Sequence, residues 1–338
     1  MNMQVDIDKV HPIDMKTDPV WKRFLSGGSG AIWFATILLF VVSSIVAPGS
    51  LDYAAVVGML PFASILAIAA VGQTLVIQQR GLDLSVPGMM AFGAALASGL
   101  PQWYGWPTWL AIAVAIVLPG VAGLVNGLVV TRFGVMPLVV TLGMNAFLLG
   151  LVFQLSSGTP AGAPPVLSAF AQGKTLGIPH IAIVAVVIIG WAGFSAQRSV
   201  VGRRLTAVGV SERAAAVIGV RVSLYQTAAY AAAGVAYGIA AVLYTGYVTT
   251  PPLFFGDSYL LASIAAVVLG GTALTGGRAA LVSSGVGALF LTQLGQLLRA
   301  MGLPEPTQLI IQAAVLLSVV ILRASVPIIQ RWISARSG

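Results

Sequence analysis

Long apolar stretches separated by short polar segments make up this chain from Ser29 to Leu322. Each is about 18–25 residues long, and a helix needs about 20 residues to cross roughly 30 Å of hydrocarbon. The apolar residues are continuous and do not alternate with polar ones, so the pattern favours membrane helices over the strands of a membrane barrel. It predicts about ten membrane-spanning helices, at 29–47, 53–79, 86–99, 109–131, 136–155, 180–197, 223–245, 258–272, 279–298 and 307–323. The third and eighth are short, which is typical of helices broken near a transport pathway.

Polar segments divide the chain into three parts. Residues 1–28 are polar and mixed in charge, and we expect a cytoplasmic N-terminal segment there. The apolar stretch that follows is too long for the core of a signal peptide, so we expect an uncleaved first helix, with a cleaved signal as the alternative. Residues 29–323 form the predicted transmembrane domain, and residues 324–338 a cytoplasmic tail. A long outer loop at 156–179 is expected to cap the external face, and a long inner loop spans 198–221.

The basic residues indicate how the chain is oriented. With the N-terminus placed inside, fifteen of the 17 Lys and Arg residues lie on the inner side, and Lys174 and Arg299 lie outside. Cytoplasmic loops of membrane proteins carry such an excess of basic residues, so both termini are predicted to be cytoplasmic. The net charge of +8 is therefore a topology signal, and nucleic-acid binding is not needed to explain it.

Residues that carry catalysis or bind metals are scarce. The chain has no Cys and only two His, far apart in the sequence, which argues against a metal site. Gly173, Lys174 and Thr175 resemble the end of a phosphate-binding loop, but the earlier glycine and the preceding strand of that motif are missing. No Ser/His/Asp set or carboxylate pair is present, so we expect a chain that is not an enzyme and holds no cofactor of its own.

The inner loop contains a short predicted helix, in the sequence GRRLTAVGVSERAAAVIGV. Ser211 is a good N-cap, and Glu212 then lies at the positive end of the helix dipole. Gly219 supplies the C-cap of a helix of about two turns. A helix this short is marginal alone in water. It either docks on a partner or connects the spans along the lipid surface, and the residues alone leave both open.

A polar turn lies between the second and third spans. Asp83 follows Gly81 and precedes Ser85, which is expected to cap a helix that has Pro87 in its first turn. A carboxylate at bilayer depth is costly. Asp83 is therefore expected to lie at the inner interface, to accept bonds from the N–H groups of the next helix, or to pair with Arg80. The turn has either a capping or a transport role.

Uncharged polar side chains lie inside the predicted spans, where they are costly unless they face protein or water. They suit the hydroxyls of a small neutral sugar or polyol, and about half are expected merely to bond helix to helix. Gln73 and Asn145 are the strongest candidates for a substrate pathway, because both lie in the blocks that carry the family resemblance described below. The predicted pathway residues are Gln73, Thr74, Gln78, Asn126 and Asn145, and further polar residues in the spans are Thr141, Gln293, Gln296 and Gln312. Span interiors hold no Asp, Glu or His, which disfavours an ion-coupled secondary transporter.

Two segments, GLVNG at 123–127 and GVAYG at 234–238, have small residues four apart. Such patterns allow helices to approach closely. Packing within the chain is the expected use, and a homodimer seam is the alternative.

Five ordered blocks resemble the permeases of ribose-type importers of the ATP-binding-cassette (ABC) class, a group that includes xylose and autoinducer-2 permeases. They are the inner loop, VGQTLVIQQRGLDLSVPGMMAFGA, LVNGLVVTRFGVM, PLVVTLGM and IAAVVLGGTALTGGRAALVSS, and the resemblance extends from about residue 60 to the end of the chain. Ser211 stands where the family usually has Asn, Glu212 and Arg213 where it has Pro and Glu, and Arg80 and Ala279 where it has Gly. The match lies in the order and spacing of the blocks.

The resemblance implies a type II-like permease fold, all-α, in the bacterial inner membrane. It implies a second permease subunit, identical or different, an ABC ATPase that holds ATP and Mg, and a periplasmic sugar-binding protein. It also implies that the inner loop contacts the ATPase, through Gly202, Arg203, Arg204, Ala207, Gly209, Ser211, Ala214, Ala215 and Gly219. Gly209→Trp or Ala215→Asp is then expected to uncouple transport, because neither touches a predicted span. The expected function is uptake of a monosaccharide or polyol, with a branched-chain amino-acid permease or a stand-alone secondary transporter as alternatives.

Overall fold

The computed structural model describes residues 29–318 and 321, and this part of the chain is almost entirely helical. The predicted N-terminal segment 1–28 and tail 324–338 lie outside the described residues. Six of the described helices are long and apolar enough to cross a membrane: α3 (Tyr53–Gln78), α5 (Thr108–Phe133), α6 (Pro137–Ser156), α8 (His180–Arg198), α11 (Val222–Val248) and α13 (Leu281–Ala300). The all-α membrane fold predicted from the apolar pattern is therefore confirmed.

The other helices are shorter or less apolar. They are α2 (Ser29–Val46), the 3₁₀ turn η2 (Pro48–Leu51), α4 (Val86–Tyr104), α7 (Pro165–Gln172), α9 (Val200–Val210), α10 (Glu212–Val217) and α12 (Asp257–Gly270). Residues 305–318 are also helical. Each predicted span coincides over its described residues with one of these helices or with one of the six long ones, and the boundaries differ by a few residues; the end of the tenth span lies outside the described residues. Which of the shorter helices cross the bilayer remains a prediction.

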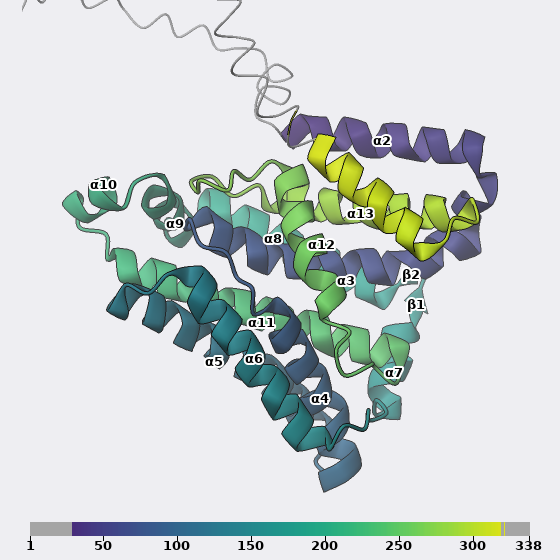
Figure 1. The fold of residues 1–338 in the computed structure, drawn as a ribbon, viewed down its shortest axis with the longest axis horizontal. Helices are drawn as coiled ribbons and strands as arrows, with labels where there is room; N and C mark the ends of the chain where they lie inside the picture. The colour runs from purple at the N-terminus through teal and green to yellow at the C-terminus, as the bar shows by residue number, and fades with distance from the viewer. Residues whose placement is uncertain (1–28, 319–320, 322–338) are drawn as a thin grey trace, which may run out of the picture.

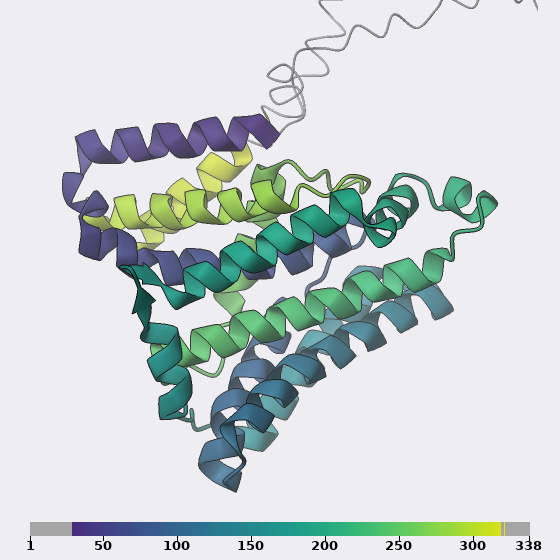
Figure 2. The same cartoon turned by 180° about the vertical axis from the view of Figure 1, so that it is seen from behind.

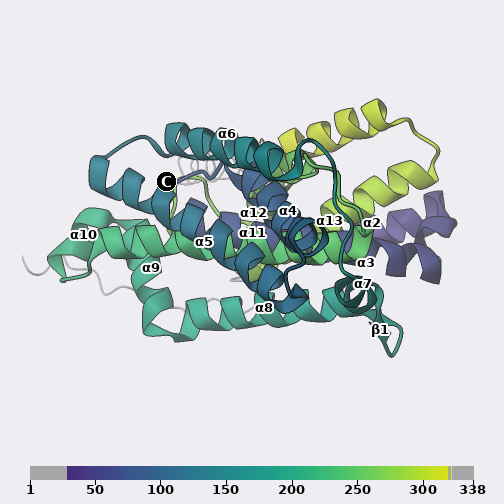
Figure 3. The ribbon, with the colours of Figure 1, turned by 90° about the horizontal axis from the view of Figure 1, so that it is seen from below.

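Helices α3 and α11 form the middle of the molecule, and the other elements pack around them (Figure 1). Helix α5 lies along α11, as Figure 2 shows from behind. Helix α13 packs on α3, and α2 packs on α13 at the edge. Helices α4 and α6 lie on the far side of α11 from α8, which Figure 3 shows from below. The core is built largely from alanine, leucine and isoleucine side chains of α3, α4, α11 and α13.

Glycine lets α5 and α11 approach closely. A Cβ atom added at Gly123 would lie 2.2 Å from the Tyr230 carbonyl oxygen, and one added at Gly234 would lie 2.1 Å from the Pro119 carbonyl oxygen. Gly127 and Gly238 face α11 and α5 in the same way. Both small-residue patterns are therefore used for packing within the chain, as the sequence favours.

One end of the bundle carries α9 and α10, and the other carries α7 and a small hairpin (Figure 1). The hairpin pairs β1 (Lys174–Thr175) with β2 (Ile178–Pro179). The Tyr53 hydroxyl donates to the Gly177 carbonyl at 3.2 Å, and His180 lies 2.9 Å from both the Thr175 hydroxyl and the Phe170 carbonyl. The Gly-Lys-Thr sequence therefore forms part of a hairpin.

The basic residues of the described segment lie at the two ends of this bundle. Arg80, Arg132 and Arg198 come at or just after the ends of α3, α5 and α8, which point toward α9 and α10. Lys174 is in the hairpin at the opposite end. Arg299 is also at the hairpin end. Gln296, less than one helical turn before it, donates a hydrogen bond to the Ser50 carbonyl, and Ser50 lies just before the start of α3. The folded chain therefore groups the basic residues as the topology prediction requires.

Candidate functional site: the inner helices, a buried polar cluster and an outer cavity

The inner loop folds into two capped helices. The Ser199 hydroxyl accepts a hydrogen bond from the Gly202 N–H at 3.0 Å and begins α9. The Ser211 hydroxyl accepts from the Ala214 N–H at 3.3 Å and begins α10, with Glu212 in its first turn. Gly219 has a φ of +79° just after the helix, and the Val220 N–H bonds to the Ala215 carbonyl. The predicted caps at Ser211 and Gly219 are thus confirmed, whereas α9 was not expected from the sequence.

Side chains at the end of α3 hold α9 in place. Gln79 Nε2 donates to the Leu205 carbonyl at 3.0 Å, and Gln78 Nε2 donates to the Thr206 hydroxyl at 3.2 Å. Arg80 donates from Nε to the Gly209 carbonyl at 3.1 Å and from a terminal nitrogen to the Val210 carbonyl at 2.5 Å. The last carbonyls of a helix carry partial negative charge, so a guanidinium is a favourable partner for them.

The same end of α3 also holds the connection between α12 and α13. The Gly277 N–H donates to the Gln78 carbonyl at 3.0 Å. A Cβ at Gly209 would lie 2.3 Å from that carbonyl and 3.1 Å from the backbone of Gly277. Three segments therefore meet at Gly209: α3, α9 and the 271–280 connection. The expectation that a change at Gly209 touches no span is wrong, because the position packs directly on the end of α3.

Helix α10 presents its free side away from the bundle (Figure 1). Val217 is 87% exposed and Ile218 is 72% exposed, whereas Ala215 is buried. Arg203 donates to the Arg198 carbonyl, Arg204 to the Tyr225 hydroxyl, and Glu212 accepts from Gln226. The guanidinium groups of Arg203 and Arg204 thus have no carboxylate partner among the described residues. This end of the molecule offers exposed apolar and cationic groups together. That the nine coupling-loop residues contact an ATPase remains a prediction.

The Asp83 turn is buried and is bonded differently from the prediction. Asp83 Oδ1 accepts from both the N–H and the hydroxyl of Ser85, and its side chain is fully buried. It does not pair with Arg80, whose side chain bonds to the end of α9. Helix α4 does begin after Ser85, but the Ser85 hydroxyl does not cap it. The partner of the Gly88 N–H is instead Asn145 Oδ1 of α6, at 2.7 Å.

A buried polar cluster forms around this turn. The Ser85 hydroxyl accepts from Asn126 of α5 at 3.0 Å, and the Leu84 N–H donates to the Thr141 hydroxyl of α6 at 3.0 Å. Gly81 leaves room for Tyr230 of α11, since a Cβ there would lie 2.3 Å from the tyrosine oxygen. The turn therefore joins α3, α4, α5, α6 and α11. This convergence could not be read from the sequence, because the bonded residues lie far apart in it.

The predicted pathway residues mostly join one helix to another. Gln73 accepts from the Tyr237 hydroxyl at 2.8 Å, and Thr74 donates to the Ser284 hydroxyl at 3.0 Å. Gln73, Thr74, Gln78 and Asn126 are all buried, and Asn145 is half-buried. Asn126 and Asn145 bond to residues at the start of α4, as described above. The hydrogen bonds of these residues join helices within the chain and do not test contact with a substrate. That contact stays a prediction.

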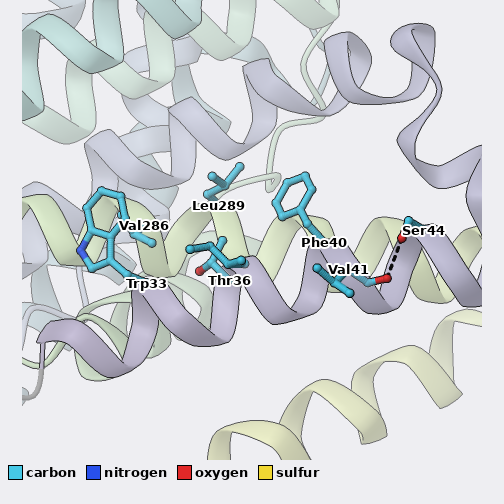
Figure 4. A pocket seen from close by; sticks show the side chains of 8 residues that line it. Trp33, Thr36, Phe40, Val41, Ser44, Val286 and Leu289 are labelled. Carbon is cyan, nitrogen blue, oxygen red and sulfur yellow. Dashed lines mark hydrogen bonds between the residues drawn. The ribbon is translucent and has the colours of Figure 1, made fainter. Parts of the chain in front are cut away.

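Three cavities differ in the chemistry of their walls. The first lies between α2 and α13 and has a volume of about 490 Å³. Figure 4 shows its apolar side chains, among them Trp33, Phe40 and Leu289. Its two hydroxyls, Thr36 and Ser44, donate to carbonyls of their own helix. Such a wall suits lipid chains.

The second cavity, of about 740 Å³, lies toward the α9–α10 end between α2, α8 and the connection before α13, and it includes Arg278. The third, of about 680 Å³, lies toward the hairpin end, which the topology prediction places outside, and is called the outer cavity below. It combines aromatic, amide, hydroxyl and guanidinium groups. Its lining residues are Gly58, Met59, Phe62, Leu66, Tyr244, Pro252, Phe255, Ser258, Tyr259, Ala262, Leu291, Thr292, Gly295, Gln296, Arg299 and Gln312. Within the described residues no group of three or more His, Asp or Glu side chains could hold a metal ion.

The chain is similar to known import permeases over most of its length. It is 32% identical to the ribose import permease protein RbsC of Bacillus subtilis over 84% of this chain and 89% of that protein. It is 33% identical to the fructose import permease protein FruF of Bifidobacterium longum, over 69% and 67%. It is 29% identical to the autoinducer 2 import system permease protein LsrD of Klebsiella pneumoniae, over 90% and 94%. No solved structure matches the chain.

A family model described as "branched-chain amino acid transport system / permease component" matches residues 55–320. This range includes the helices and inner segments described above, from α3 to residues 305–318. The chain therefore belongs to this family of transport permease components, and within it to the ribose-type ABC permeases.

Proposed function

We propose that this chain is the membrane-spanning subunit of an ATP-driven importer that carries a monosaccharide or polyol across the bacterial inner membrane. The observation that carries the proposal is the attachment of α9 to the end of α3 and to the 271–280 connection, with α10 following α9 at Ser211. A force applied to α10 by a partner would reach these two elements through α9. A chain without nucleotide-binding motifs needs such a partner to use ATP.

The partner at α10 is proposed to be an ABC ATPase. The exposed Val217 and Ile218 offer apolar contact, and Arg203 and Arg204 offer hydrogen bonds to acidic groups. The complete importer would contain two permease subunits, two ATPase domains and a periplasmic sugar-binding protein. This chain would contribute ten spans, with both termini in the cytoplasm. The basic residues at the α9–α10 end support that orientation.

The substrate is proposed to be a sugar because the relatives named above import ribose, fructose or autoinducer 2. The family description names branched-chain amino acids, which are therefore the alternative to exclude. An amino acid brings an ammonium group as well as a carboxylate. The outer cavity offers no Asp or Glu to bind an ammonium group.

Transport by the reconstituted complex tests the function. The permease is purified with its ATPase, reconstituted into liposomes and supplied with the binding protein. Uptake of labelled pentoses, hexoses and leucine is then measured with and without ATP. ATP-dependent uptake of a sugar is expected. Leucine uptake without sugar uptake would refute the substrate class and leave the permease assignment intact, whereas a complex that binds no ATPase would refute the coupling role of α10.

A further inference from the structure

We propose that the outer cavity is the site where this chain binds the transported sugar. This inference rests on the proposed function and adds the location of the substrate site. The cavity lies among the N-terminal half of α3, the end of α11, the start of α12, the C-terminal half of α13 and the helical residues 305–318. Of the polar span residues that the sequence suggests for sugar hydroxyls, Gln296 and Gln312 line the cavity, whereas Gln73 and Asn145, the strongest candidates, do not.

One wall of the cavity is aromatic. Tyr244 and Phe255 are stacked, with ring centroids 4.0 Å apart and ring planes 5° apart. Tyr259 meets both rings edge-on at 6.0 Å, and Phe62 meets Tyr244 edge-on at 6.5 Å. These contacts fix the rings in place before any ligand binds. Phe255 and Tyr259 are buried, whereas Phe62 is exposed and Tyr244 is half-buried, so these last two rings offer apolar surface to the C–H groups of a sugar ring.

Most of the polar lining of the cavity comes from α13 and the helix that follows it. Gln296 Nε2 donates a hydrogen bond to the Ser50 carbonyl at 2.8 Å, and the side-chain oxygen of Gln296 is left as an acceptor. The side chains of Arg299 and Gln312 make no hydrogen bonds within the described residues, although both line the cavity. Together these three residues offer donors and an acceptor to a ligand rich in hydroxyl groups.

The amide and guanidinium groups of the outer cavity distinguish it from a groove filled by lipid. Amide and guanidinium groups facing hydrocarbon are costly, so membrane proteins place them against protein or water. The cavity between α2 and α13, by contrast, has only two hydroxyls, and both bond to their own helix. A volume of about 680 Å³ is ample for a monosaccharide and falls in the usual range of ligand pockets.

The charge of the cavity wall disfavours a ligand that carries a cationic group. Arg299 is the only charged residue of the cavity wall, within the described part of the chain. It can donate to hydroxyl or ring oxygens without requiring an anion. A zwitterionic amino acid would place its ammonium group among aromatic rings and amides with no carboxylate to pair with it.

Cysteine labelling tests the site directly, because the natural chain has no Cys. Thr292→Cys places a thiol in the cavity wall, and Lys174→Cys places one at the exposed hairpin as a matched control. The complex is held in lipid nanodiscs, where a charged methanethiosulfonate reagent reaches both faces.

Ribose, fructose or leucine is added before the reagent. At a concentration about ten times its dissociation constant, a bound sugar should slow labelling at residue 292 about tenfold. Labelling at residue 174 should not change.

A cavity-filling variant gives a second, independent measurement. Gly295 faces the cavity, since a Cβ there would lie 3.3 Å from the Gln312 amide nitrogen. Gly295→Leu should raise the KM for the imported sugar or abolish its uptake, with ATPase binding unchanged. Gly150→Leu on α6 is the control, because a Cβ at that position meets no atom within 4 Å.

The outcomes separate this inference from the proposed function. Sugar uptake by the natural complex together with unprotected labelling at residue 292 and normal uptake by Gly295→Leu would overturn the cavity assignment alone. Failure of the natural complex to import any tested sugar while it imports leucine would overturn the substrate class and this inference with it. Sugar protection at residue 292, absent at residue 174, would support the site.

Discussion

Ser85 links the connection between α3 and α4 to the middle of α5. Its hydroxyl donates to Asp83 Oδ1 and accepts from Asn126 Nδ2, and all three side chains are buried. A buried polar atom that loses its partner retains the full cost of its desolvation. The hydroxyl therefore satisfies two groups that water does not reach, one of them a carboxylate.

Replacing Ser85 with Ala should destabilise the protein by about 2 kcal/mol, since two buried groups lose a hydrogen bond at once. The melting temperature in detergent measures this loss. Ser64→Ala is the matched control, because Ser64 is buried in α3 and donates only to the Leu60 carbonyl of its own helix. Removing such a bond is close to neutral. Equal melting temperatures for the two variants would show that the Asp83 cluster contributes nothing to stability.

Local patterns were predictable at the residue scale, and distant partners were not. Ser211 and Gly219 cap α10 as expected, because a cap depends on residues within one turn. The partner of the α4 N-terminus is Asn145, 57 residues away from Gly88 along the chain. Arg80 beside Asp83 suggested an ion pair, yet Arg80 has a φ of 65° and reaches the end of α9 instead. Sequence proximity cannot specify which of several acceptors a long side chain will reach.

At the scale of elements, the attachment of α9 to α3 is the feature on which coupling depends. Arg80 contributes two hydrogen bonds to the last carbonyls of α9, and Gln78 and Gln79 contribute two more. Helix α9 has 11 residues and α10 has six, so neither is long enough to be stable alone in water. Their position is therefore set by these contacts with the transmembrane helices.

Arg80→Met should lower transport roughly three- to tenfold, because the two bonds to the end of α9 are lost while the apolar stem is kept. ATP hydrolysis by the complex should continue, so the ratio of substrate imported to ATP hydrolysed should fall. Arg132→Met is the control, since Arg132 is also exposed and comes at the same end of the bundle. An unchanged ratio in Arg80→Met would contradict the proposed transmission from α9 to α3.

The apolar pattern predicted the elements that lie in the membrane better than those at its surfaces. Every predicted span coincides with a helix because lipid requires backbone groups to be satisfied within the helix itself. The sequences of α7 and the hairpin contain Gly, Pro and Ser, which indicate a loop. They are ordered by tertiary contacts, such as the bond from Gln172 Nε2 to the Tyr247 carbonyl at 3.0 Å. Helix α9 was missed because its stretch is short and carries Arg203 and Arg204.

At the scale of the whole molecule, the two ends of the bundle differ in charge and in construction. The end with α9 and α10 carries Arg203, Arg204 and Arg213, whereas the hairpin end carries Lys174 and Arg299. The outer cavity lies toward the hairpin end, and the cavity that includes Arg278 lies toward the other. An excess of basic residues at one end is typical of the cytoplasmic side of a membrane protein.

Topology reporters should place the two ends on opposite sides of the membrane. Leu176 is 97% exposed in the hairpin turn and Ile218 is 72% exposed after α10, so both tolerate an inserted tag better than a packed position would. Alkaline phosphatase is active only in the periplasm and should be active at residue 176. A fluorescent protein that folds in the cytoplasm should fluoresce at residue 218 and after Gly338.

Preserved transport in each fusion would control for misinsertion. Reporters at 176 and 218 on the same side would refute the orientation, because the bundle separates these two positions and basic residues favour the cytoplasmic side.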